Sequence, residues 1–183
     1  MEKIISLFQR NYETDRLVRN ELVPGAEWVT TGEGIATEKI DGTACMIRAG
    51  LLYKRYDAKR GKKPPIGFEP AQDTPDEVTG HWPGWVPVGQ EPESKWHRQG
   101  FANSPHCDNG TYELIGPKVQ GNKYRLDKHV LRLHGDVILN YVPVTFEGIR
   151  GYLAAHPQFE GIVWHHPNGR MVKIKRRDYG LTW

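Results

Sequence analysis

The chain has 183 residues, a formal net charge of +3 and a hydrophobic content of 38%, with two cysteines. This length suits one domain of ordinary size, and two cysteines exclude a disulfide framework and a four-cysteine zinc site. The sequence has neither the pattern of a signal peptide nor an apolar run long enough to span a membrane. We therefore expect a cytoplasmic protein without a membrane partner. Its mild positive charge is compatible with a polyanion such as nucleic acid.

The first third of the chain predicts mostly strands. Residues 1–9 are the exception, because their apolar spacing favours a short helix. Residues 17–29 predict two strands joined by a Pro24-Gly25 turn. Residues 34–56 predict further strands around a turn at Ala49 and Gly50.

The segment around 59–110 has a different character. It is rich in proline and contains Trp82, Trp85 and Trp96, and no helical or alternating period persists in it. A loop of this length without structure is uncommon inside a small domain. We expect an ordered insertion with short strands, held in place by its tryptophans as core residues rather than as platforms for nucleobases.

The last part of the chain returns to regular patterns. Residues 112–120, 129–135 and 137–142 predict strands, and residues 145–156 predict a helix with Thr145 as N-cap. Residues 159–176 predict a β-hairpin around a Pro-Asn-Gly turn. The expected fold class is α+β, with antiparallel sheets and few helices.

The stretch Lys39-Ile40-Asp41-Gly42 places chemistry at the end of a predicted strand. Lys39 and Asp41 share one face by the strand period, and Gly42 marks a bend or a close approach of the backbone to a ligand. A lysine attacks a phosphoryl centre only as the neutral amine, a form that nearby cations favour. The alternative is a solvated ion pair on a strand.

Four further residues carry charges in predicted apolar strands: Glu113, Glu160 and the pair Lys173 and Lys175. A lone carboxylate in an apolar strand suits a hard divalent cation. The two lysines share one face and can hold phosphate oxygens. The alternative for the carboxylates is a protective role at a sheet edge.

In chain order, KIDG, YELIG, EGIV and KIK resemble the motifs of the covalent nucleotidyltransferases, which are the ATP-dependent DNA and RNA ligases and the mRNA capping enzymes. Motif I is K-x-D-G, motif III centres on an acid, motif IV is close to E-G-x-V, and motif V is K-x-K. The segments GEGIATEKIDGTACMI, YKRYDAKRGKKPPIGFEP, TGHWPGWVPV and TYELIGPKVQGN are most similar to the compact single-domain 5′–3′ RNA ligase 1 family. This similarity covers nearly the whole chain, including the segment 59–110.

The resemblance implies one ATP-grasp-like adenylyltransferase domain over residues 1–183. DNA ligases and capping enzymes continue after motif V into an OB-fold domain, whereas this sequence ends eight residues after Lys175. We therefore expect no C-terminal OB domain, which argues against a capping enzyme and an ordinary DNA ligase.

The resemblance also implies an activity. Lys39 would attack the α-phosphate of ATP to form lysyl-AMP, and AMP would pass to an RNA 5′-phosphate before a 3′-hydroxyl joins the ends. Lys173 and Lys175 would neutralise the α-phosphate, and Glu160 with Asp41 would serve Mg²⁺ or Mn²⁺. The nucleotide-binding set comprises Lys39, Asp41, Gly42, Arg55, Glu113, Lys173 and Lys175.

The RNA partner has less distinct candidates. Basic residues near an aromatic side chain suit a phosphate backbone and stacked bases, and the candidates of this kind are Lys54, Lys59, Arg60, Lys62, Lys63, Arg176 and Arg177. The first five can equally form a soluble loop. The aromatic residue that stacks on the nucleotide base stays open among Tyr112, Phe146 and Phe159.

Other functions stay open beside RNA ligation in RNA repair. One is DNA nick sealing or protein adenylylation on the same scaffold, and another is a catalytically silent RNA-binding module. The charged residues of all four motifs are present, which disfavours the silent module. The oligomeric state is left open.

Overall fold

The computed structural model describes residues 3–77 and 79–183. They form two compact units, and each is described by itself. The central unit consists mainly of Asp41–His134, and the terminal unit consists of Ile4–Ile40 and Gly135–Trp183. The chain crosses between them within the KIDG motif, so that Lys39 belongs to the terminal unit and Asp41 to the central unit. The prediction of a single domain over 1–183 stays a prediction.

The terminal unit is built on a four-stranded sheet in the order β1-β12-β11-β4, in which only the β1–β12 pair is parallel. A two-stranded sheet, two helices and a 3-10 turn complete it. Its elements are β1 (Ile5–Ser6), β2 (Phe8–Arg10), β3 (Val18–Leu22), α1 (Glu27–Thr30), β4 (Ile35–Lys39), α3 (Phe146–Ala155), β11 (Gly161–His165), β12 (Met171–Lys175) and η3 (Arg176–Tyr179).

The core of the terminal unit lies on one face of this sheet. Ile162 of β11 and Ile174 of β12 are fully buried, together with Ile149 and Leu153 of α3. The Thr145 hydroxyl caps α3 by accepting a hydrogen bond from the Gly148 N–H at 3.2 Å. Since alternate residues of β12 fill the core, its lysines are left for the other face of the sheet.

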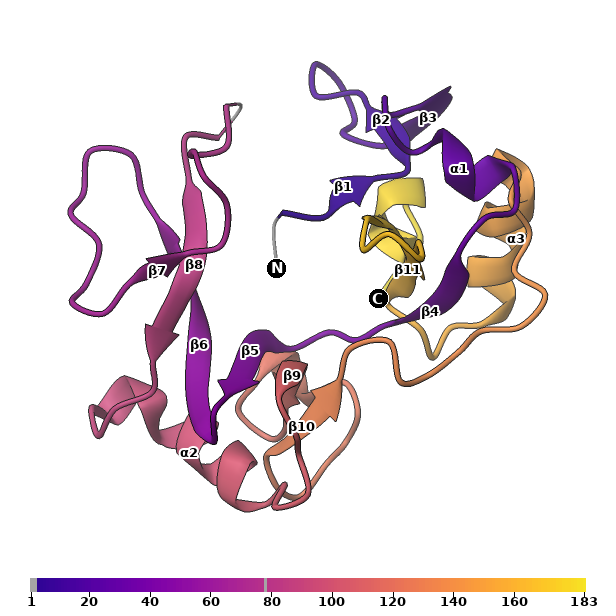
Figure 1. Cartoon of the computed structure of the whole chain (residues 1–183). Helices are drawn as coiled ribbons and strands as arrows, with labels where there is room; N and C mark the ends of the chain where they lie inside the picture. Colours follow the sequence, from indigo (N-terminus) through magenta and orange to yellow (C-terminus); the bar gives the residue numbers. More distant parts are fainter. Residues whose placement is uncertain (1–2, 78) are drawn as a thin grey trace. The chain divides into compact units, whose positions relative to one another are not determined.

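The central unit contains a six-stranded antiparallel sheet in the order β10-β9-β5-β6-β8-β7. Figure 1 shows β6 and β8 running side by side, with α2 close to one end of β6. The core beneath α2 is formed by Cys45, Leu52, Leu114 and Leu131 with their neighbours. The elements are β5 (Thr43–Arg48), β6 (Leu51–Ala58), β7 (Glu69–Pro70), β8 (Trp82–Pro87), η1 (Pro92–Ser94), α2 (Lys95–Ala102), β9 (Gly110–Ile115), η2 (Gln120–Asn122) and β10 (Val130–Leu133).

The segment 59–110 forms the expected short strands, and it also forms η1 and α2, which were not expected. Trp85 is buried, and the indole N–H of Trp82 donates to the Gln72 carbonyl at 2.7 Å while its ring packs against Phe68. These contacts hold segments together that have no period of their own.

The α+β class with mainly antiparallel sheets is confirmed, as are the helix after Thr145 and the final hairpin. Three local predictions were wrong. Residues 5–10 form β1 and β2 instead of a helix, and residues 1–2 lie outside the described residues. Residues 27–30 form α1, and residues 137–142 contribute only a single bridge between Thr37 and Ile138.

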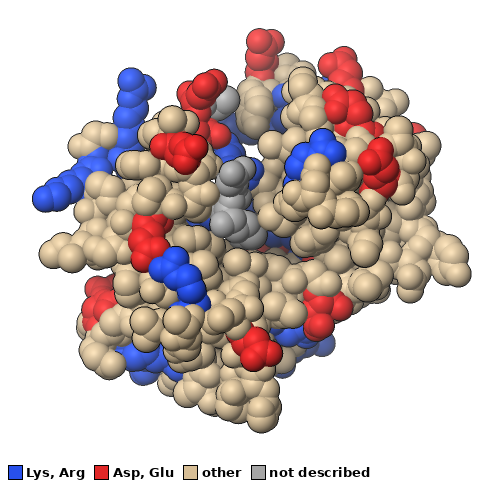
Figure 2. Space-filling view, viewed as in Figure 1, with Lys and Arg blue, Asp and Glu red and all other residues tan. Residues whose placement is uncertain are grey.

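The described residues include no helix long and apolar enough to cross a membrane. On the face shown in Figure 2, Lys and Arg side chains are interspersed with Asp and Glu. The positive net charge alone therefore does not locate a binding site, and local geometry has to do so.

Candidate active site

The register of the terminal sheet brings distant parts of the sequence together. Gly161 at the start of β11 pairs with Lys39 at the end of β4 on one side and with Lys175 at the end of β12 on the other. Glu160 directly precedes Gly161. The KIDG, EGIV and KIK motifs therefore meet at one end of three adjacent strands.

One buried carboxylate holds two amines at this point. The Lys39 Nζ donates to Glu160 Oε2 at 2.6 Å, and the Lys175 Nζ lies 3.2 Å from Glu160 Oε1. The Glu160 residue is only 3% exposed. A carboxylate taken so far from water requires charged partners, and here both oxygens have one.

Lys173 adds a third amine on the same face, two residues before Lys175. Burial, followed by the positive charges of Lys175 and Lys39, lowers the pKa of Lys173 to about 8. Burial and the charge of Lys39 also lower the pKa of Lys175. Among the described residues, the Lys173 amine has no hydrogen-bond or ion-pair partner. This surplus of positive charge suits an anion such as a phosphate group.

Gly161 is needed for this arrangement. A Cβ atom at this position would lie 2.2 Å from the Ile174 carbonyl oxygen and 2.9 Å from the Lys175 Cα. The next turn is fixed by Asp178, which accepts the Lys175 N–H at 2.8 Å and pairs with Arg10. The backbone that carries Lys175 is therefore held on both sides.

In the central unit, Glu113 lies on β9 opposite Ala44 of β5 and Arg132 of β10. Its carboxylate is within 2.7 Å of the His134 Nε2. Sequence analysis missed His134. The alternation of the predicted strand 129–135 places it on the face of Arg132, but that pattern does not reveal which carboxylate lies nearby.

Arg55 lies on the same face of the central sheet as Glu113, by the alternation of β5 and β6 from the Cys45–Lys54 pair. Its Nε donates to Asp57 at 3.0 Å, and its guanidinium lies 5.6 Å from the centre of the Trp85 ring. The structure thus groups two predicted nucleotide-binding residues on one sheet face of the central unit.

The second half of the KIDG motif is tied to the segment after β9. The Asp41 N–H donates to the Tyr124 hydroxyl at 2.8 Å, and the Gln120 side chain donates to the Gly42 carbonyl at 3.3 Å. A Cβ atom at Gly42 would lie 2.3 Å from the Leu114 carbonyl oxygen. Glycine is required here because the backbone of β9 approaches so closely.

Comparisons with known proteins agree with this set of motifs. A family model described as RNA ligase 1 matches residues 104–183. The chain is 28% identical to RNA ligase 1 of Rattus norvegicus in an alignment that is 229 positions long. This alignment covers 81% of this chain and 68% of the relative. The chain is 29% identical to RNA ligase 1 of Danio rerio in an alignment of 221 positions, with the same two shares. Both comparisons show that the chain is similar to RNA ligase 1 proteins.

The match to the RNA ligase 1 family model contains Glu113, Glu160, Lys173 and Lys175. Lys39 and Arg55 lie outside residues 104–183. The register of β4 beside β11 independently associates Lys39 with the matched residues. It brings the Lys39 amine to 2.6 Å from the Glu160 carboxylate.

Glu160 is the carboxylate of the terminal unit that directly contacts the lysine amines and is the candidate there for a divalent metal. Within the described part of the chain, no group of three His, Cys, Asp or Glu side chains is arranged to hold a metal ion. Mg²⁺ is commonly held by one or two carboxylates together with substrate phosphates, and Glu160 fits that pattern. It would have to share its oxygens with, or release, one of its two lysines. The predicted metal role of Asp41, which belongs to the central unit, stays a prediction.

Two of the predicted RNA contacts are cations with partners inside the protein. Lys54 points to the α2 side of the central sheet, where its amine lies 2.7 Å from both Glu91 and Ser94. Arg176 is 6% exposed, and its guanidinium donates to the carbonyl groups of Leu153, His156 and Thr182. Both cations already have partners within their own units, which disfavours a contact with RNA, and the prediction that they contact RNA stays a prediction.

The other basic candidates are exposed: Lys59, Arg60, Lys62, Lys63 and Arg177. The first three line a cavity of about 570 Å³ that also contains Asp76 and Trp82. The aromatic candidates for base stacking are less accessible. Tyr112 belongs to the core of the central unit, and Phe146 and Phe159 pack against the core of the terminal unit.

Proposed function

We propose that the chain is an ATP-dependent RNA ligase that joins 5′-phosphate and 3′-hydroxyl RNA ends through a lysyl-AMP intermediate. The observation that carries the proposal is the group of three lysine amines around the buried Glu160 carboxylate. The order of the motifs and the names of the RNA ligase 1 relatives support it.

In the first step, the neutral Lys39 Nζ attacks the α-phosphorus of ATP. An N–P bond forms, the P–O bond to the β-phosphate breaks, and pyrophosphate leaves. Glu160, 2.6 Å from the amine, is placed to receive the proton that the lysine loses. Lys173 and Lys175 neutralise the charge that develops on the phosphoryl oxygens.

In the second step, an oxygen of the RNA 5′-phosphate attacks the phosphorus of the bound AMP. The N–P bond breaks, and the amine of Lys39 is regenerated. In the third step, the 3′-hydroxyl of another end attacks the 5′-phosphate, a phosphodiester bond forms, and AMP leaves. We assign Asp41, Gly42, Arg55 and Glu113 to the nucleotide on the strength of the family resemblance.

Mg²⁺ or Mn²⁺, when bound, supplies further neutralisation of the phosphate charge. Glu160 is the residue of the terminal unit that would hold it. We propose a role in RNA repair, because broken RNA with these two kinds of end would be a substrate of this reaction.

The decisive test is the intact mass of the purified protein after incubation with ATP and magnesium. We expect a gain of one AMP in the wild type and none in Lys39→Ala. Lys39→Arg is the matched control, because it retains a cation beside Glu160 but lacks the nucleophilic amine. A folded wild-type protein that gains no nucleotide from ATP or GTP, with either metal, would overturn the proposal.

The substrate is tested next with 5′-phosphorylated RNA, DNA and mixed ends. We expect joined RNA. Joining of DNA alone would instead identify a DNA nick-sealing enzyme, and transfer of AMP to a protein would identify a protein-adenylylating enzyme.

A further inference from the structure

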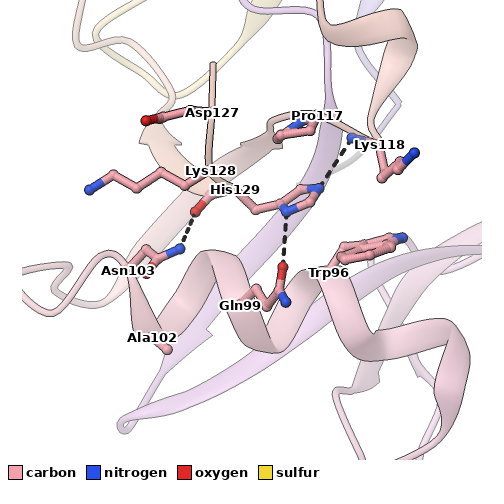
Figure 3. A pocket seen from close by; sticks show the side chains of 9 residues that line it. All are labelled: Trp96, Gln99, Ala102, Asn103, Pro117, Lys118, Asp127, Lys128 and His129. Atoms are coloured by element: carbon pink, nitrogen blue, oxygen red, sulfur yellow. Dashed lines mark hydrogen bonds between the residues drawn. The ribbon is translucent and has the colours of Figure 1, made fainter.

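The central unit contains a second pocket, of about 460 Å³, whose lining lies outside the KIDG, YELIG, EGIV and KIK motifs. It lies between α2 and two loop segments, and Figure 3 shows side chains of α2 directed toward the imidazole of His129 and the backbone that carries it. The residues on which the inference rests are Trp96, Gln99 and Asn103 of α2 with Lys118, Lys128 and His129.

His129 forms a fixed, uncharged wall of this pocket. Its Nε2 accepts the Lys118 N–H at 3.3 Å, so its Nδ1 carries the proton and donates to Gln99 Oε1 at 3.1 Å. The ring stacks on Trp96 with 4.7 Å between the ring centres and 19° between the planes. Burial lowers the pKa of His129, which keeps the imidazole neutral at pH 7.

The amides of α2 present one donor and one acceptor beside this wall. Gln99 uses its Oε1 on His129, and Asn103 uses its Nδ2 on the His129 carbonyl at 2.9 Å. The Gln99 Nε2 and the Asn103 Oδ1 have no hydrogen-bond partner among the described residues. Gln99 and the C-cap residue Asn103 lie one helical turn apart on α2, and a donor and an acceptor at this spacing match the edge of a nucleobase, which carries both kinds of group.

The rim of the pocket is basic. Lys118 and Lys128 are exposed and line it together with one acid, Asp127. The segment 118–128 between them contains four basic residues and one acidic residue. Such a balance suits a strand of phosphates that runs past the pocket.

This basic segment is held in a defined conformation. Gln120, Asn122 and Arg125 have φ values of 44°, 52° and 51°, and the Asn122 side chain makes two hydrogen bonds of 2.9 Å with the backbone of Leu126. Non-glycine residues keep a left-handed backbone conformation only where their surroundings fix it, and such residues are common at binding sites. Tyr124 and Gln120 of the same segment contact the backbone of the KIDG motif. The segment therefore links the pocket to that motif within the central unit.

We propose that this pocket binds one nucleotide of the RNA strand near the end to be joined. The base lies beside Trp96 and His129 with its edge on the Gln99 and Asn103 amides, and Lys118 and Lys128 hold the flanking phosphates. The inference rests on the proposed function and adds an RNA site outside the lysine motifs.

The test measures the Kd of the full chain for a 5′-phosphorylated single-stranded RNA at several salt concentrations. The variants Lys118→Glu and Lys128→Glu are compared with Arg150→Glu, an equal change of charge on α3 in the terminal unit. We expect each pocket variant to bind about tenfold more weakly than this control, with a salt dependence reduced by about one phosphate contact. Affinities within twofold of the control would overturn the proposal.

A second readout uses RNA that carries 4-thiouridine near its 5′ end. Crosslinked peptides are expected within 95–103 and 116–129. Crosslinks confined to 59–63 would instead place the RNA on the basic loop and reject the pocket. The two proposals fail separately, because lysyl-AMP formation by the wild type is measured without RNA, whereas these experiments measure RNA binding alone.

Discussion

The Nζ of Lys39 lies 2.6 Å from the Oε2 of Glu160, a carboxylate that shares its other oxygen with Lys175 at 3.2 Å. The proposed nucleophile is thus joined to a buried acid through residues that are 121 positions apart in the sequence. The acid offsets the positive charges of Lys39 and Lys175, and together with Asp178 it partly offsets that of Lys173 on the same sheet face.

The first prediction concerns the ion pairs between Glu160 and the amines of Lys39 and Lys175. Glu160→Gln retains the shape of the side chain but removes the charge, which leaves the amines of Lys39 and Lys175 without a carboxylate. Breaking a buried ion pair in this way typically costs roughly 3–5 kcal/mol, and we expect a loss of this size in the free energy of unfolding measured with urea. Glu147→Gln is the control, because this carboxylate is 74% exposed and its pair with Arg150 is 3.6 Å long. Equal stability of the two variants would contradict the prediction.

The second prediction concerns the pH dependence of Lys173. Its pKa is about 8 in the folded protein against an ordinary value of 10.5. Below pH 8 the amine is charged in both states, and its burial destabilises the fold. As the pH rises from 8 to 10.5, the folded state loses its proton first and this penalty disappears. We expect the wild type to gain roughly 1–3 kcal/mol relative to Lys173→Met between pH 7 and pH 10. If the stabilities of the wild type and Lys173→Met depend on pH in the same way, the pKa of the Lys173 amine is not lowered by folding.

The alternation of β12 explains why its lysines could be assigned from the sequence. Val172 and Ile174 are buried, so a strand at this place must turn Lys173 and Lys175 to the other face. The position of Glu160 between two lysines could not be predicted. It depends on Gly161 being paired with Lys39 and Lys175 at once, which is a property of the sheet order.

Lys54 shows the opposite case. Its sequence neighbours are basic and include an aromatic residue, which predicts either an RNA contact or a soluble loop. Its partners Glu91 and Ser94 come from the segment 59–110, where no period predicts a structure. The N-terminal strands were missed for a related reason. Leu7 and Phe8 are both buried, and the Leu7 N–H donates to the Lys173 carbonyl, so long-range pairing overrides the local helical spacing.

The third prediction follows from the ion pair between Lys54 and Glu91. The hydrogen bond from Lys54 is the largest cause that lowers the pKa of Glu91 to about 2. In Lys54→Met, we expect the pKa of Glu91 to rise toward its ordinary value of 4.5, as followed by NMR of the carboxyl group. The affinity for RNA should stay within twofold of the wild type, because the amine is already paired with Glu91 and Ser94. A large loss of RNA affinity with an unchanged Glu91 pKa would support Lys54 as an RNA contact.

The fourth prediction concerns the close approach of β11 and β12. In Gly161→Ala, the new methyl group would meet the Ile174 carbonyl, so β11 and β12 must separate. They would separate at Gly161, the residue that pairs with Lys39 on one side and with Lys175 on the other. We expect a loss of about 2 kcal/mol in the free energy of unfolding. The rate of lysyl-AMP formation should fall on the order of 10–100-fold, because the amine is displaced from its position for attack.

Gly151→Ala is the matched control for this variant. Gly151 lies within α3, and a Cβ atom there meets nothing within 4 Å. The same substitution should therefore stabilise the protein by about 0.5–1 kcal/mol, since alanine favours the helix and restricts the unfolded chain. Opposite signs for the two glycine variants are the expected outcome. If Gly161→Ala is as stable and as active as Gly151→Ala, the contact between the strands does not hold the lysines in place.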